Sequence, residues 1–187
     1  MRILLALLSA LLLFAGCSTT TVRARPQTVR AAGAELDATA LVEALLDWKG
    51  TRVQAVNGSW RDRAFQAQCV MKGDGARLRV VFLAPQLRLV TITVERPHRV
   101  TCERAPQIPD AFEPEYALAD LAYVNLDAAT LRRVLAPALR VEERGDLRRI
   151  LTAGGEPVAE VVRPAAGDWT FRNLEHGYTY TLKTIGN

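Results

Sequence analysis

The sequence has little of what most catalytic sites are built from. Only three of its 187 residues are serine (Ser9, Ser18 and Ser59), and it contains no Gly-x-Ser-x-Gly motif, which argues against a serine nucleophile. It has two histidines, His98 and His176, each beside an expected turn, and no Cys-x-x-Cys or His-Glu-x-x-His pattern. We therefore expect no metal site and no cofactor.

The sequence also has no large excess of charge of either sign, and it has few aromatic residues. It contains 24 Lys and Arg residues and 20 Asp and Glu residues, and the basic residues form no block. Aromatic residues make up 6% of the chain. This pattern argues against nucleic acid as a partner. With 49% hydrophobic and 24% charged residues, the chain is too apolar to be disordered and too charged to be a polytopic membrane protein. Its length suits one domain.

Apolar residues are concentrated at the N-terminus. After Arg2, an almost continuous apolar run extends from Ile3 to Ala15. The run is shorter than the roughly 20 residues that a membrane-spanning helix needs, so we interpret residues 1–16 as a secretory signal peptide. It ends in Phe14-Ala15-Gly16-Cys17, which resembles the lipobox of bacterial lipoproteins.

The lipobox resemblance implies that Cys17 is lipidated, becomes the first residue of the mature protein and anchors it to a membrane through acyl chains. In lipoproteins of this kind, an Asp directly after the lipidated cysteine resembles the signal for retention in the inner membrane. Here that position is Ser18, so we expect a Gram-negative outer-membrane lipoprotein facing the periplasm. The alternative is an ordinary signal peptide with a chance cysteine. Residues 17–34 have no apolar period and are expected to form a flexible tether, and residues 35–187 a single domain.

Turn residues divide the first half of the domain into short segments. Between the turns apolar and polar residues alternate, as in Leu78–Phe82 and Val90–Glu95, which is typical of half-buried antiparallel strands. Asn-Gly is the preferred pair for a type I′ hairpin and would separate a strand at Thr51–Val56 from one at Ser59–Met71. The expected turns are Asn57-Gly58, Gly73-Asp74-Gly75, Pro85 and Pro97.

Three segments have helical spacing instead. Leu36 to Trp48 carries apolar residues on one face and has Asp37 near its start, which predicts a helix. A second helix is expected to begin at Glu113-Pro114-Glu115, because proline and acids are favoured at a helix start. A third is expected from Asp127, as N-cap, to just before Pro137.

Regularly spaced turns return in the second half and predict an antiparallel meander of five strands. The turns are Gly145-Asp146, Gly154-Gly155, Gly167-Asp168 and His176-Gly177. The strands that they separate are Leu139–Arg144, Leu147–Ala153, Pro157–Arg163, Trp169–Leu174 and Tyr178–Ile185.

The expected fold is therefore mostly β with a few helices (α+β): a curved antiparallel half-barrel of about ten strands with a helical plug or lid. This layout resembles the LolA/LolB superfamily, whose unclosed barrel carries helices as a lid and holds the acyl chains of lipoproteins. The run Pro114-Glu115-Tyr116-Ala117-Leu118-Ala119-Asp120-Leu121, with Asn57-Gly58 before it and Asn173-Leu174-x-x-Gly177-Tyr178 after it, resembles more closely a family of uncharacterised bacterial lipoproteins. Its members are often encoded beside aryl-polyene or fatty-acid-type biosynthesis genes, and the resemblance covers roughly Thr51 to Ile185.

Cys69 and Cys102 both fall on the apolar face of an expected strand. An oxidising periplasm favours a disulfide, but a sequential meander places two strands between them. Three spacings of about 4.8 Å exceed the roughly 7 Å limit between bridged Cα atoms. We therefore expect buried free thiols; a disulfide would require another strand order. The adjacent acids Glu142 and Glu143 point to opposite faces of a strand and cannot act as a dyad.

Bulky apolar residues at alternating positions are the remaining candidates for a site, where they either line a ligand cavity or fill the core. One hypothesis is a carrier that binds and hands over a hydrophobic acyl, lipid or polyene-type molecule in the cell envelope. The other is a non-catalytic accessory scaffold with a filled core that docks an envelope protein. No catalytic constellation is apparent, so we expect that the protein is not an enzyme. We also expect a monomer. The candidates are Phe82, Ile92, Val94, Leu118, Leu121, Trp169, Phe171, Tyr178 and Tyr180.

Overall fold

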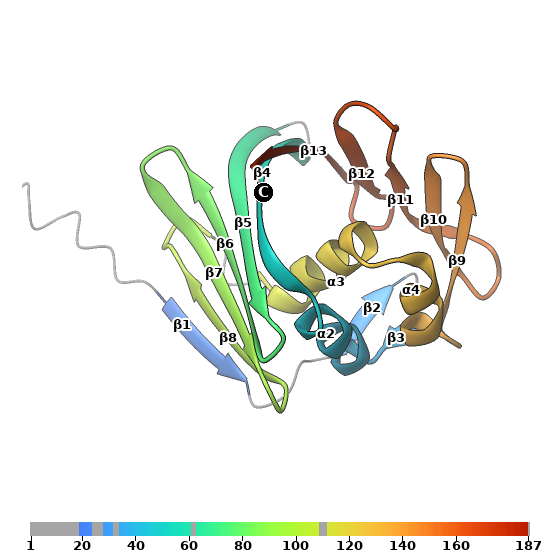
Figure 1. Cartoon of the computed structure of the whole chain (residues 1–187), viewed down its shortest axis with the longest axis horizontal. Helices are drawn as coiled ribbons and strands as arrows, with labels where there is room; N and C mark the ends of the chain where they lie inside the picture. The colour runs from blue at the N-terminus through green and yellow to red at the C-terminus, as the bar shows by residue number, and fades with distance from the viewer. Residues whose placement is uncertain (1–18, 24–27, 32–33, 61–62, 109–111, 187) are drawn as a thin grey trace, which may run out of the picture.

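The computed structural model describes residues 19–23, 28–31, 34–60, 63–108 and 112–186. The expected signal peptide, residues 1–16, and the expected lipidation site, Cys17, lie outside the described residues. Within them the chain is mostly strand, with three helices (Figure 1). None of these three helices is long and apolar enough to cross a membrane.

One open antiparallel sheet holds most of the described strands: β1 (Thr19–Arg23), β4 (Lys49–Trp60), β5 (Arg63–Asp74), β6 (Arg77–Ala84), β7 (Leu87–Glu95), β8 (Arg99–Arg104), β9 (Leu139–Arg144), β10 (Leu147–Thr152), β11 (Pro157–Val162), β12 (Trp169–Asn173) and β13 (Tyr178–Gly186). These 11 strands lie in the order β1-β8-β7-β6-β5-β4-β13-β12-β11-β10-β9, so two meanders join where β13 pairs with β4. The edge strands β1 and β9 do not pair with each other. The expectation of a mostly β, open, antiparallel sheet with about ten strands is confirmed.

The sheet curves around the helices, with β5 to β8 on one side of them and β9 to β12 on the other (Figure 1). The helices are α2 (Ala38–Leu46), α3 (Pro114–Asn125) and α4 (Ala128–Leu135), and all three were expected. Asp37 caps α2 by accepting a hydrogen bond from the Thr39 amide at 2.8 Å, and Asp127 caps α4 by accepting one from the Thr130 amide at 2.8 Å. Each cap satisfies an amide that the helix itself leaves unpaired. Two further strands, β2 (Val29–Ala31) and β3 (Ala34–Leu36), pair with each other.

Most strand boundaries fall at the expected turns. β5 ends at Asp74, whose Oδ1 accepts hydrogen bonds from the amides of Ala76 and Arg77 at 2.8 and 2.7 Å. Turns at Pro85 and Pro97 separate β6, β7 and β8, and the four expected turns of the second half separate β9 to β13. The sequential order of β5 to β8 leaves two strands between Cys69 and Cys102, and both cysteines are buried with no disulfide between them, as expected.

The expected hairpin turn at Asn57-Gly58 is wrong. β4 runs without interruption through both residues, and Gly58 pairs with Phe65 of β5 and Tyr180 of β13. A Cβ atom at Gly58 would lie 2.5 Å from Phe65 Cζ and 2.8 Å from Tyr180 Cβ. The glycine therefore allows two aromatic side chains to approach the backbone of β4, and it does not form a turn.

Part of residues 17–34 is more ordered than the expected tether. β1 pairs with β8 along its whole length, from Thr19 opposite Arg104 to Arg23 opposite Val100, and β2 lies in its own small sheet. The run Thr19–Val22 consists of β-branched residues, which favour strands, and the outer edge of β8 offers backbone groups for pairing. Local propensity and an available edge outweigh the lack of an apolar period.

Candidate functional site

Helix α3 lies against the concave face and contacts both meanders. Asn125 Nδ2 is 3.8 Å from Met71 Sδ of β5, and Asp120 is bound by Asn173 of β12 and Tyr178 of β13. Its apolar side packs into the continuous core, which it shares with α2 and the strands. α3 therefore covers the part of the sheet where a ligand cavity was expected.

The carboxyl group of Asp120 is buried between α3 and the sheet, with 7% of the residue exposed. Asn173 Nδ2 donates hydrogen bonds to Asp120 Oδ1 at 3.3 Å and to Tyr178 Oη at 3.0 Å, and Tyr178 Oη donates to Asp120 Oδ2. Burial favours the neutral acid more than these hydrogen bonds favour the carboxylate, and it raises the pKa of Asp120 to about 7. This group fastens α3 to the β12–β13 hairpin.

A row of stacked rings continues from this carboxyl group, and we call it the aromatic row: Phe171, Tyr180, Tyr178 and His176. Ring centroids are 4.8 Å apart for Phe171 and Tyr180, 6.3 Å for Tyr180 and Tyr178, and 6.4 Å for Tyr178 and His176. Tyr116 of α3 meets the edge of His176 at 5.1 Å. Ring contacts of this kind stabilise beyond their area alone, so the row adds a second connection between α3 and the hairpin.

Next to the aromatic row lies a partly exposed apolar surface, the aromatic rim, made of Phe65, Ala67, Phe82 and Tyr180. The register places all four on the same face of the sheet, because Cys69, two residues beyond Ala67, pairs with Phe82, and Gly58 pairs with both Phe65 and Tyr180. Phe65 is 38% exposed, and the other three pack against the core while remaining partly accessible. The rim is therefore one place where the apolar concave face reaches solvent.

The nine residues expected to line a cavity separate into three sets. All nine belong to one hydrophobic core or pack against it, but they differ in exposure. Trp169 faces Arg163, whose Cζ is 4.8 Å from its ring centroid. Phe82, Tyr178 and Tyr180 are partly exposed and belong to the aromatic row or rim. The fully packed set, with exposed fractions of 0 to 5%, is Ile92, Val94, Leu118, Leu121 and Phe171.

Three arginines from the sheet side, which we call the arginine cluster, reach the C-terminal end of α3: Arg52 of β4, Arg148 of β10, and Arg163 just after β11. Arg148, 3% exposed, donates from Nη1 to the carbonyl oxygens of Tyr123 at 2.8 Å and Leu126 at 2.7 Å. Its Nη2 is 2.6 Å from Glu143 Oε1. These contacts neutralise carbonyl groups that the helix leaves unpaired.

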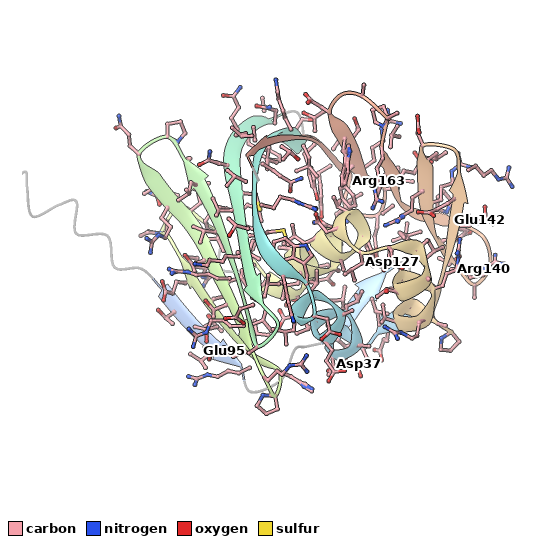
Figure 2. All side chains as sticks on the ribbon, in the orientation of Figure 1. Asp37, Glu95, Asp127, Arg140, Glu142 and Arg163 are labelled. Atoms are coloured by element: carbon pink, nitrogen blue, oxygen red, sulfur yellow. The ribbon has the colours of Figure 1, made fainter. Side chains whose placement is uncertain are left out.

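The other two arginines each combine a contact to α3 with a tryptophan. Arg163 donates to the carbonyl oxygen of Val124, and its Cζ lies over Trp169. Arg52 donates to Asn125 Oδ1, and its Cζ lies 5.9 Å from the ring centroid of Trp48. Figure 2 shows Arg163 between α3 and the strands of the second meander.

A cavity of about 250 Å³ lies where the ends of α2, α3 and α4 meet. Two of its lining residues, Trp48 and Asn125, are the residues that Arg52 contacts. Across the described ranges, no three His, Cys, Asp or Glu side chains are grouped so that they could hold a metal ion. The full lining is Ala44, Asp47, Trp48, Asn125, Leu126, Asp127, Thr130 and Arg133.

Sequence reasoning missed the polar part of this site. Asp120 stands between Leu118 and Leu121 on a helix whose spacing buries both leucines, and that position was the available indication of a buried acid. Arg148 likewise shares a strand face with Ile150, which is 0% exposed. A charged residue at an apolar position of the pattern is informative because such a group is buried only with partners.

Comparisons with known proteins give a family without an activity. No match was found among curated proteins. A family model described as a protein of unknown function (DUF3261) matches residues 51–186, which include β4 from Thr51 onward, β5 to β13, α3, α4 and every residue of the aromatic row and arginine cluster. The chain therefore belongs to this family of proteins of unknown function.

Proposed function

We propose that this protein is an outer-membrane lipoprotein, lipidated at Cys17, that binds a hydrophobic acyl, lipid or polyene-type molecule and hands it over in the cell envelope. Its sheet is in this proposal a LolA/LolB-like half-barrel with α3 as the lid. The observation that carries the proposal is the aromatic rim, an apolar surface open to solvent at Phe65 and continuous with the core beneath α3.

In this mechanism the cargo enters over the rim and takes the place of side chains that α3 now buries. Burial of a 12-carbon chain is favourable by roughly 8–10 kcal/mol before other terms, at about 0.8 kcal/mol for each CH₂. Leu118 and Leu121 of α3 would leave the core, and the hydrogen bonds of Asp120 would open. Transfer then depends on the difference between burial here and burial in the acceptor.

The alternative is a non-catalytic scaffold lipoprotein that docks an envelope protein. Its support is the continuous packing of the concave face, where Ile92, Val94 and Phe171 are 0% exposed in the closed arrangement. In this case α3 is a permanent plug, and the partner binds outside the core.

Binding of a fluorescent fatty acid to the full chain distinguishes the two functions. The carrier predicts saturable binding, displacement by unlabelled fatty acid, and co-purifying lipid in native mass spectrometry. Phe65→Asp is expected to weaken binding at least tenfold, because it puts a charge on the rim. The matched control is Ile185→Asp, which changes a residue that is 57% exposed on β13 but not part of the rim. Absence of cargo and of displacement refutes the carrier and leaves the scaffold.

A further inference from the structure

The arginine cluster contains more positive charge than its surroundings neutralise. Arg148 binds the carboxylate of Glu143, which also acts electrostatically on Arg163. Among the described residues, Arg52 and Arg163 form no ion pair with an acid. Burial, together with the charges of Arg148 and Arg52, lowers the pKa of Arg163 to about 10, although Glu143 opposes the shift. Like charges held this close in a half-buried site repel each other.

Capping of α3 explains Arg148 but not the whole cluster. Arg148 uses its donors on two helix carbonyl groups and on Glu143. The C-terminus of a helix is equivalent to only about half a negative charge, which one cation already balances. Arg163 also has a buried Nε–H without an acceptor in the described part of the chain. A buried unpaired donor is unfavourable, so its presence calls for a group not yet accounted for.

The two uncompensated arginines are oriented to receive such a group. Arg163 lies over Trp169 and Arg52 over Trp48, with Cζ 4.8 and 5.9 Å from the ring centroids, so each cation has a ring on one side. A guanidinium carries its N–H groups around its edge, where a planar or tetrahedral oxyanion accepts two of them at once. Both arginines are half-buried, which leaves part of each accessible to a solute.

We propose that Arg52 and Arg163 bind the anionic head group, a carboxylate or a phosphate, of the amphiphile whose apolar chain the concave face takes up. This inference rests on the proposed carrier function and deepens it by naming the chemistry of the cargo. When α3 moves to admit the cargo, the head group accepts the Nε–H of Arg163, which is buried in the closed arrangement, and it neutralises the excess charge. Tyr116 contacts the aromatic row and Asn125 contacts Arg52, so the nine-residue step between them along α3, about 14 Å, separates the apolar end of the site from the anionic end.

The test compares three amphiphiles of equal chain length on the full chain: dodecanoate, dodecyl phosphate and dodecanol. We expect dissociation constants for one or both anions at least tenfold below that for the neutral alcohol. Arg163→Gln, and separately Arg52→Gln in case the first variant unfolds, should reduce that preference to threefold or less. The control Arg79→Gln removes a charge from an exposed position of β6 and should keep the full preference. The two anions distinguish a fatty-acid head group from a phosphate head group.

Equal binding of dodecanol and both anions, or a preference that survives in both arginine variants, overturns the proposal. Failure of all three amphiphiles to bind refutes the carrier function instead, and inorganic phosphate then tests the anion site by itself. The site stands if phosphate raises the melting temperature of the wild-type and Arg79→Gln proteins more than that of Arg163→Gln. It is overturned if phosphate shifts all three equally.

Discussion

Replacement of Asp120 by asparagine should make the protein more stable above neutral pH. The carboxyl group is buried against Asn173 and Tyr178, and burial raises its pKa from 3.8 to about 7. In the unfolded chain the same group ionises near its ordinary pKa. As the pH rises from about 4 to about 7, the unfolded chain releases this proton first, so the folded state loses stability over that window. Above pH 7 the loss is complete.

The magnitude follows from the width of the window. Each pH unit between the two pKa values is worth about 1.4 kcal/mol, so the folded state loses about 3 kcal/mol between pH 5 and pH 8 through this one group. Asparagine removes the ionisation and keeps the shape. Its amide oxygen accepts from one of the two donors, and its NH₂ group donates to Tyr178 Oη, which can accept as well as donate.

Guanidinium-induced unfolding at pH 5 and pH 8 measures the effect. The wild-type free energy of unfolding should fall by about 3 kcal/mol more between these pH values than that of Asp120→Asn. Asp168→Asn, in the exposed turn before β12, matches the change in net charge and should behave like wild type. An equal pH dependence in wild type and Asp120→Asn would show that Asp120 does not titrate inside the protein, and the reasoning would be refuted.

Three further predictions concern the fold. Gly58→Ala should destabilise the protein by about 1–3 kcal/mol in thermal unfolding, because its Cβ would lie 2.7 Å from the Thr179 carbonyl oxygen. The control Gly154→Ala, whose Cβ would have its nearest neighbour 3.6 Å away, should lower the melting temperature far less. Asp37→Ala should lose about 1 kcal/mol in urea unfolding by removing the cap of α2, and Asp37→Ser should restore most of it. Cys69 and Cys102 should each take up one alkylating group under denaturing, non-reducing conditions and none in the native protein, because both are buried. Burial also raises the pKa of the Cys69 thiol to about 12. A single bridged species would contradict this prediction.

The strand and helix pattern was largely predictable, because it depends on local periodicity and capping. Asp37 and Asp127 marked two helix starts, and alternation on β6 and β7 marked the buried face. The prediction of a turn at Asn57-Gly58 was wrong because the pair favours a hairpin locally, whereas here the glycine allows close contact between β4 and β13, which are distant in sequence. β1 was missed for a similar reason, since its pairing depends on an edge that forms about 80 residues later.

The site was less predictable than the fold. Bulky residues such as Ile92 and Phe82 follow the same alternation, yet one is fully packed and the other partly exposed, because exposure depends on where α3 lies over the sheet. The arginine cluster brings together three strands and the end of a helix, and no local pattern encodes that meeting.

The pairing of β1 with β8 changes how this chain should be shortened. A protein trimmed at residue 35, where the domain was expected to begin, would lose β1 and β2 and leave the outer edge of β8 without its partner. Unpaired edges recruit strands from other molecules, so such a protein should self-associate. The opposite edge, β9, has charged residues at Arg140, Glu142 and Arg144, which hinder pairing with another chain (Figure 2). One edge is thus protected by its own charged side chains, and the other ends in a strand of only five residues instead of the longer edge of β8.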